Sequence, residues 1–151
     1  MKRFFILFLT LGALLYACNC KVEGEKIRCD YYVVKKHDTS KSNHCLKYAK
    51  TIYSDNMPAK ASWYYLLGGD KENAKKSAKK ALSIGLDFAS EYLGFVYMLD
   101  KDYKNAQKQF EKLKKSVKDT DYVKRDIITM KNRFDSFDAE KASKMMFGDN
   151  I

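Results

Sequence analysis

The chain has 151 residues, the length of one domain, and its 29 Lys and Arg against 19 Asp and Glu give a net charge of +10. Such a charge favours acidic partners: anionic lipid, nucleic acid or an acidic protein face. One proline and seven glycines argue against a β-sandwich and against long loops. The abundance of alanine, lysine and tyrosine instead favours packed helices with solvated lysine faces.

The first seventeen residues have the pattern of a cleaved signal peptide. Lys2 and Arg3 form a short positive segment, and residues 4–17 are apolar apart from one threonine and one glycine. This run is shorter than the about 20 apolar residues of a transmembrane helix, but it fits the apolar core of a signal peptide. We therefore expect residues 1–17 to be removed on export from the cytoplasm.

A cysteine follows the apolar run directly, in the sequence Leu15-Tyr16-Ala17-Cys18. This sequence resembles the lipobox of bacterial lipoproteins, in which the cysteine is acylated and becomes the first residue of the mature protein. The resemblance implies that several acyl chains on Cys18 anchor the protein firmly. Asn19 stands where many inner-membrane lipoproteins have aspartate, so the outer membrane is slightly favoured, with the protein facing the periplasm. Ordinary secretion and an uncleaved anchor are the alternatives.

Three further cysteines lie in the first third of the chain: Cys20, Cys29 and Cys45. Export usually brings cysteines into an oxidising compartment, and three thiols allow one disulfide and one leftover. We expect the bond to join Cys29 to Cys45, because this pair ties the β-prone residues 31–34 to the start of the helical part.

Residues 18–42 are expected to form a small appendage and linker. The turn signal at Glu23-Gly24 lies between two short apolar-polar runs and predicts a hairpin over residues 20–29. A metal site is the other use of the polar residues in this region, namely Cys29, His37, His44 and Cys45. Their spacing lacks the short ligand pairs of zinc sites, so we expect neither a metal nor a cofactor.

From residue 43 the sequence has helical periodicity and repeats at an interval of 32 residues. Ala49, Ala81 and Leu113 mark this interval, and small or apolar residues recur three and seven positions before each of them. Such spacing places the residues on one helix face. We therefore expect residues 43–147 to form a helical domain built from repeated units.

The clearest copy, residues 90–113, contains Leu93-Gly94, Tyr97, Ala106 and Phe110. It resembles the tetratricopeptide repeat, whose pattern is W-x2-L-G-x2-Y followed by A-x3-F. Gly94 and Ala106 are small, so two helices can approach closely, and the aromatic residues fill the space between hairpins. A weaker copy covers residues 58–81. The resemblance implies a mainly α fold, a short stack of antiparallel helical hairpins, with the disulfide-tied hairpin segment at its N-terminal end.

In this family, the first helix of each hairpin lines a concave face that binds peptides or proteins. On this chain those helices span roughly residues 56–67 and 88–99. The resemblance then implies that the groove is lined by Trp63, Leu66, Glu91, Phe95 and Met98. Trp63 and Phe95 are one interval apart and are expected to stack side by side. The alternative is that they pack against the appendage or a neighbouring hairpin.

Motifs of catalysis are missing from the sequence. It contains no Gly-rich phosphate loop, no G-x-S-x-G and no H-E-x-x-H, so we expect no enzyme activity. Lysines recur on the outer side of the second helices, at Lys75, Lys76, Lys79, Lys80, Lys112, Lys114 and Lys115. They form either a solvated face or a contact with anionic lipid beside the anchor. Nucleic acid is not an expected partner of an exported protein.

These patterns together indicate a lipid-anchored adaptor of the cell envelope, which binds another envelope protein or peptide through its concave surface. The alternative is a secreted binding or inhibitor protein, in which the cysteine-tied hairpin is the active surface and the helices are its scaffold. Deleting residues 21–40 separates the two, because the deletion spares an adaptor's binding and abolishes that of a hairpin binder.

Acylation of Cys18 can be tested directly. The Cys18→Ser variant should accumulate as an unprocessed precursor in the membrane fraction, because processing of a lipoprotein requires the acylated thiol. Immunoblotting of fractionated cells measures this. Normal processing, with the mature variant free in the soluble fraction, would contradict acylation.

Overall fold

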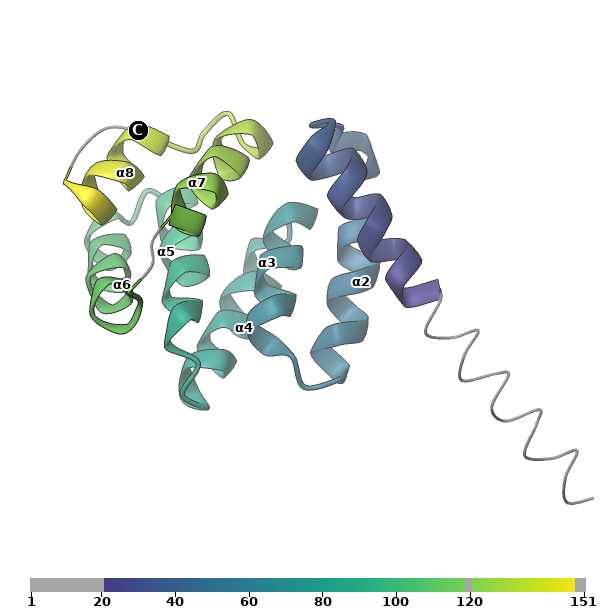
Figure 1. Cartoon of the computed structure of the whole chain (residues 1–151), viewed down its shortest axis with the longest axis horizontal. Coiled ribbons are helices and arrows are strands. Elements are labelled where there is room, and N and C mark those ends of the chain that lie inside the picture. The colour runs from purple at the N-terminus through teal and green to yellow at the C-terminus, as the bar shows by residue number, and fades with distance from the viewer. Residues whose placement is uncertain (1–20, 119–120, 149–151) are drawn as a thin grey trace, which may run out of the picture.

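The computed structural model describes residues 21–118 and 121–148, and in these two stretches the chain is mainly helical and has no strand (Figure 1). Residues 21–29 are helical and continue into a π-helical segment, Asp30–Lys35, and a short 3-10 helix, Thr39–Lys41. Helix α2 (Asn43–Ser54) follows. The expected signal peptide, Cys18 and Cys20 lie outside the described residues.

Six further helices follow α2 in the order α3 (Pro58–Gly68), α4 (Lys71–Ser83), α5 (Ser90–Leu99), α6 (Tyr103–Ser116), α7 (Asp121–Arg133) and α8 (Ala139–Phe147). The turns inside the hairpins α3–α4 and α5–α6 are short, which makes each pair antiparallel neighbours. An aspartate caps the second helix of each pair: Asp70 accepts from the Asn73 N–H at 3.0 Å, and Asp102 accepts from the Asn105 N–H at 3.2 Å. The second helix of each hairpin therefore begins with the same kind of aspartate cap.

Gly94 gives α5 and α6 their close approach, as its position in the repeat predicts. A Cβ atom placed on Gly94 would lie 2.7 Å from Cε1 of Phe110 on α6, closer than real Cβ contacts allow. Phe110 and Ala106 are both fully buried at this contact. The ring of Phe110 therefore occupies the space that any larger residue at position 94 would need.

The N-terminal segment is attached to the helices by a disulfide between Cys29 and Cys45, which confirms the expected pair. Both cysteines are fully buried. The Tyr64 hydroxyl on α3 donates to the Asp30 carboxylate at 3.0 Å, so the segment packs against α3 as well as α2. The segment thus lies against α2 and α3, and its own Val33 is buried in the core.

The expected hairpin in this segment is wrong, because residues 21–29 form a helix. Its side chains support the helix through pairs one turn apart, such as Lys26 Nζ with Asp30 Oδ2 at 2.9 Å. Residues 31–34 are β-prone in isolation, yet burial of Val33 against the core holds them in a π-helical turn. Tertiary packing has overridden the local preference here.

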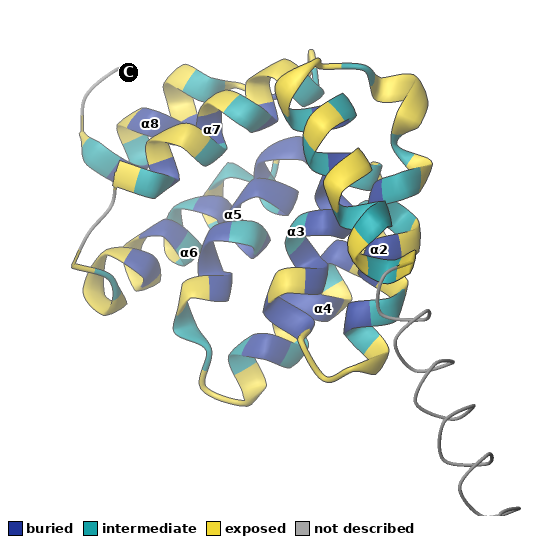
Figure 2. Ribbon diagram, turned by 45° about the vertical axis from the view of Figure 1, so that its right-hand side comes forward, coloured by how far each residue is buried: buried dark blue, intermediate teal, exposed yellow. Residues whose placement is uncertain are grey.

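Helix α7 reaches back toward the N-terminal segment, whereas α8 lies against α6 (Figures 1 and 2). Val123, Ile127 and Met130 of α7 are fully buried in one continuous core with the residues of α3 and α5. At the end of α7, Arg133 donates from Nε to the Leu67 carbonyl at 2.8 Å and from Nη2 to the Ser42 hydroxyl at 3.1 Å. This arginine fastens α7 to the end of α3 and the start of α2.

No helix among the described residues is both long and apolar enough to span a bilayer.

The disulfide should contribute a large share of the stability. Replacing both of its cysteines (Cys29→Ser with Cys45→Ser) should lower the free energy of unfolding by about 2–4 kcal/mol, because the bond restricts the unfolded chain and the two thiols are buried. Urea unfolding measures this, and wild-type protein with reductant is the control that should match the double variant. Equal midpoints for oxidised and reduced wild type would contradict the prediction.

Candidate functional site

Four of the five residues expected to line the groove are buried. Leu66, Glu91 and Phe95 have no exposed surface, and Met98 has 1%. The ring of Phe95 packs edge-on against Phe110 at 5.9 Å and Phe137 at 5.6 Å between ring centroids. The expectation that these residues face an open groove is therefore wrong, because α7 and the following Phe137 join α3 and α5 in one buried core.

Trp63, the fifth residue, is half-buried and packs on the neighbouring hairpin, which is the stated alternative to stacking on Phe95. Its ring lies 5.7 Å from that of Tyr92 on α5, with the planes inclined by 32°. Phe88, which is 39% exposed, meets Tyr92 edge-on at 6.5 Å. We call Trp63, Phe88 and Tyr92 the aromatic patch. It joins the two hairpins at the surface and is the candidate contact site for a partner.

Sequence reasoning missed Tyr92 and Phe88, although a signal for them exists. Phe88 and Tyr92 are four positions apart, which places them on one side of the first turns that lead into α5. Strict use of the 32-residue interval selects Phe95 instead. The structure rotates α5 so that Phe95 points into the core and Tyr92 toward Trp63.

Glu91 is the most unusual residue of this region. It is fully buried, and neither carboxyl oxygen makes a hydrogen bond of normal geometry to the described part of the chain. Burial, with repulsion from the Asp126 carboxyl on α7 as a second cause, raises the pKa of Glu91 well above its ordinary value. Burial also raises the pKa of Asp126 to about 6, against the lowering effects of Glu91 and Arg125. The two facing carboxyls therefore hold a proton to higher pH than isolated side chains of their kind.

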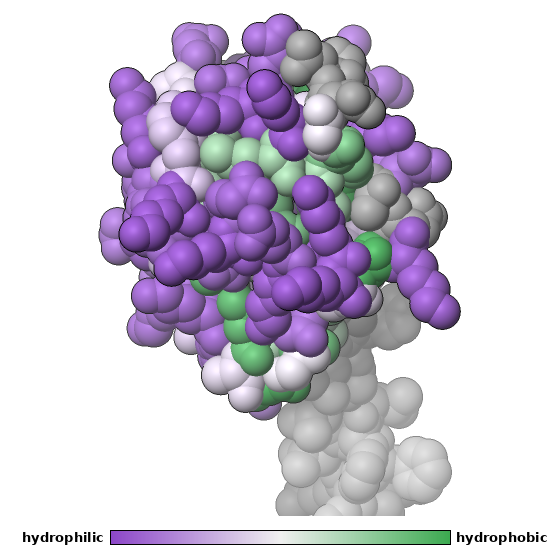
Figure 3. Space-filling model, turned by 90° about the vertical axis from the view of Figure 1, so that its left-hand side faces the viewer, coloured by the Kyte–Doolittle hydropathy of each residue, from purple (hydrophilic) through white to green (hydrophobic). Residues whose placement is uncertain are grey.

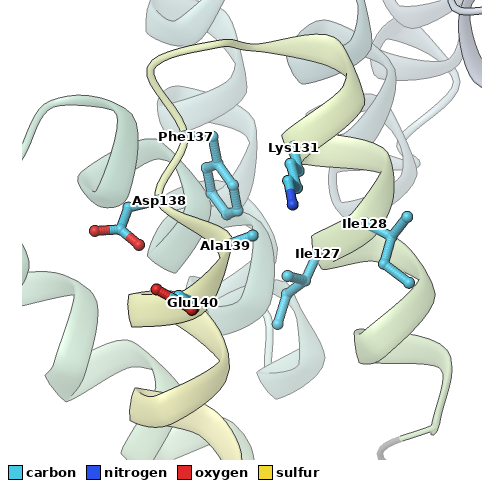
Figure 4. A pocket seen from close by; sticks show the side chains of 7 residues that line it. All are labelled: Ile127, Ile128, Lys131, Phe137, Asp138, Ala139 and Glu140. Carbon is cyan, nitrogen blue, oxygen red and sulfur yellow. The ribbon is translucent and has the colours of Figure 1, made fainter. Parts of the chain in front are cut away.

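A shallow hollow of about 460 Å³ lies between α7 and the start of α8 (Figure 4). Its lining combines apolar and charged side chains: Ile127, Ile128, Lys131, Phe137, Asp138, Ala139 and Glu140. Asp138 is already engaged, because its carboxylate caps α8 by accepting from the Lys141 N–H at 2.9 Å. With both signs of charge on its rim, the hollow does not select one kind of ligand.

The lysines on the second helices lie on the outside, as expected. On α4, Lys76 and Lys79 are exposed, and on α6, Lys112, Lys114 and Lys115 are exposed. Figure 3 shows mostly hydrophilic side chains on the face that lies to the left in Figure 1, on the side of α6 and α8. Lys112 Nζ pairs with Asp87 at 2.9 Å, but exposed pairs of this kind contribute little to stability. The surface is therefore a solvated basic face available to an acidic partner.

The cysteines considered for a metal site are bonded to each other, and His44 pairs with Glu25. In the stretches that the structure describes, no three or more His, Cys, Asp or Glu side chains gather as metal ligands do.

Comparisons of this chain with protein families, with characterised proteins and with solved structures find no significant match.

The Glu91→Gln variant should be more stable than the wild type at about pH 7.5, because burial raises the pKa of Glu91 in the folded state. The folded state holds Glu91 protonated, whereas the unfolded state releases the proton above pH 4.5, so wild-type stability falls as pH rises from there through the folded pKa. The amide keeps the size of the protonated carboxyl without titrating, so the advantage should vanish near pH 4.

Urea unfolding at both pH values measures this difference, and Glu111→Gln, at an exposed site on α6, is the matched control. A stability difference between Glu91→Gln and wild type that does not change with pH would contradict the prediction.

Proposed function

We propose that this protein is a lipid-anchored adaptor of the cell envelope, facing the periplasm, that binds another envelope protein or peptide. The proposal combines the lipobox-like sequence ending at Cys18 with a short stack of helical hairpins of the tetratricopeptide type. Consecutive antiparallel hairpins and the Gly94–Phe110 contact support this arrangement. The basic face on α4 and α6 is suited to contact anionic lipid beside the anchor.

The aromatic patch is the observation that carries the binding function. The three residues of the aromatic patch come from successive hairpins and remain partly exposed. In contrast, Leu66, Phe95 and Met98, which were expected to line a groove, are buried. Tryptophan and tyrosine are enriched among the residues that dominate binding energy at protein interfaces. A patch of this kind therefore suits a protein or peptide ligand better than a small polar substrate.

The alternative of a hairpin-based inhibitor loses its main support, because its proposed active surface is a helix that packs on α2 and α3.

Removing a member of the aromatic patch should weaken partner binding and leave the fold intact. A partner is first captured from envelope extract by wild-type protein, and its affinity for purified variants is then measured by calorimetry. Trp63→Ala and Phe88→Ala should each weaken binding by about 1–4 kcal/mol. Ile27→Ala, which removes a 65% exposed apolar side chain from the N-terminal helix, is the matched control and should change nothing.

Stability separates this result from simple unfolding. Phe95→Ala should cost about 3–5 kcal/mol of folding stability, since its ring lies in the core, whereas Phe88→Ala should cost far less. A partner that binds Trp63→Ala and Phe88→Ala as tightly as wild type would rule out the aromatic patch as its contact site.

A further inference from the structure

We propose that Glu91 and Asp126 form a binding site for an organic cation, the ammonium or guanidinium group of a lysine or arginine side chain on the partner. The inference rests on the proposed function, since it gives the partner's chemistry at the edge of the aromatic patch. Four features carry it: an unsatisfied buried carboxyl, a second carboxyl facing it, an aromatic wall and a half-open side.

The unsatisfied carboxyl is Glu91. Its side chain has no exposed surface, and apart from an interaction with the Asp126 carboxyl neither oxygen has a hydrogen-bond partner within the described residues. A buried polar group without a partner costs free energy, and for a charged group this cost is large. Such a group needs either a proton or a nearby cation. In the free chain the two carboxyls hold a proton, and a cation of the partner would replace it.

The second carboxyl belongs to Asp126, on a different helix. Glu91 lies in the first turn of α5 and Asp126 in the middle of α7, and residues of both helices belong to one buried core. Asp126 is only half-buried, so it forms the side of the site that opens to solvent. A cation that enters there meets Asp126 first and Glu91 behind it.

Tyr92 supplies the wall. Its ring stacks on Trp63, and burial together with the nearby charges of Glu91 and Asp126 raises the pKa of its hydroxyl. Tyr92 therefore belongs to the aromatic patch and also interacts electrostatically with both carboxyls. Ammonium and guanidinium groups bind favourably to carboxylates and to aromatic faces, so this combination suits an organic cation.

Two further titratable groups act on this part of the structure, and both belong to α7. They are Arg125, whose charge acts on Asp126, and Tyr122, which acts on Tyr92 together with the carboxyls. A metal ion fits the site less well than an organic cation, because calcium takes six to eight oxygen ligands. The described residues offer no cluster of three or more metal-ligating side chains.

Binding of a cation should release a proton. Two facing carboxyls cannot both ionise easily, so the empty pair keeps one proton. A cation between them favours the charged form of both and displaces that proton to solvent. A purely structural carboxyl pair would show no such exchange.

The test uses three blocked tripeptides as probes, acetyl-Gly-X-Gly-amide with X as lysine, arginine or the uncharged norleucine. Fluorescence of Trp63, the single tryptophan, reports binding, and calorimetry in two buffers of different ionisation enthalpy reports proton release. We expect saturable millimolar binding of the lysine and arginine peptides with proton release, and none of the norleucine peptide. Glu91→Gln and Asp126→Asn should each weaken binding by about tenfold or more, and Glu111→Gln should not.

The outcomes separate this inference from the adaptor function. Equal binding of all three peptides, no saturable binding, or binding that Glu91→Gln and Asp126→Asn leave unchanged would overturn the cation site. A captured partner that still depends on Trp63 would then preserve the adaptor function alone. Asp126→Asn changes the half-exposed member of the pair and is therefore an independent second test of the site.

Discussion

Helix α7 packs its apolar stripe, Val123, Ile127 and Met130, against the face that α3 and α5 present together, and the other features of the surface follow from this contact. Helices α3 and α5 are apolar on nearly every side, with buried residues all around their axes. A helix of that kind must be covered on all sides. An open stack would leave one apolar side of α3 and α5 in water, and α7 buries that side. Arg133 at the end of α7 donates a hydrogen bond to the Leu67 carbonyl at the end of α3.

The same contact traps polar groups that an open face would leave in water. Glu91 would be a solvated acid on a bare α5, but under α7 it faces Asp126 in a desolvated setting. Proteins retain such costly groups most readily where they serve binding or conformational specificity. In this protein the buried carboxyl lies beside the aromatic patch, where α3, α5 and α7 meet, and not in the hydrophobic centre of the bundle.

The sequence predicted best what depends on contacts between neighbouring helices. The glycine at position 94 and the Cys29–Cys45 pair both act over short distances. The predictions of an N-terminal hairpin and of an open groove were wrong, because both features depend on packing against distant parts of the chain. Burial of Val33 overrode the local β preference, and α7 covered the predicted groove. The all-round apolar character of α5 was visible in its sequence and already argued against one exposed side.

The arrangement also separates two surfaces of opposite character. The second helices, α4 and α6, carry exposed lysines outward, whereas the first helices and α7 carry the aromatic patch and the carboxyl pair. Because Trp63 and Tyr92 lie on α3 and α5, a ligand on the aromatic patch need not compete with an anionic surface held by the lysines of α4 and α6. A chain with a net charge of +10 repels basic ligands at long range, so a lysine or arginine of the partner gains its attraction only at close range, from the desolvated carboxyls themselves. Such a site contributes selectivity for the geometry of the bound partner more than speed of encounter.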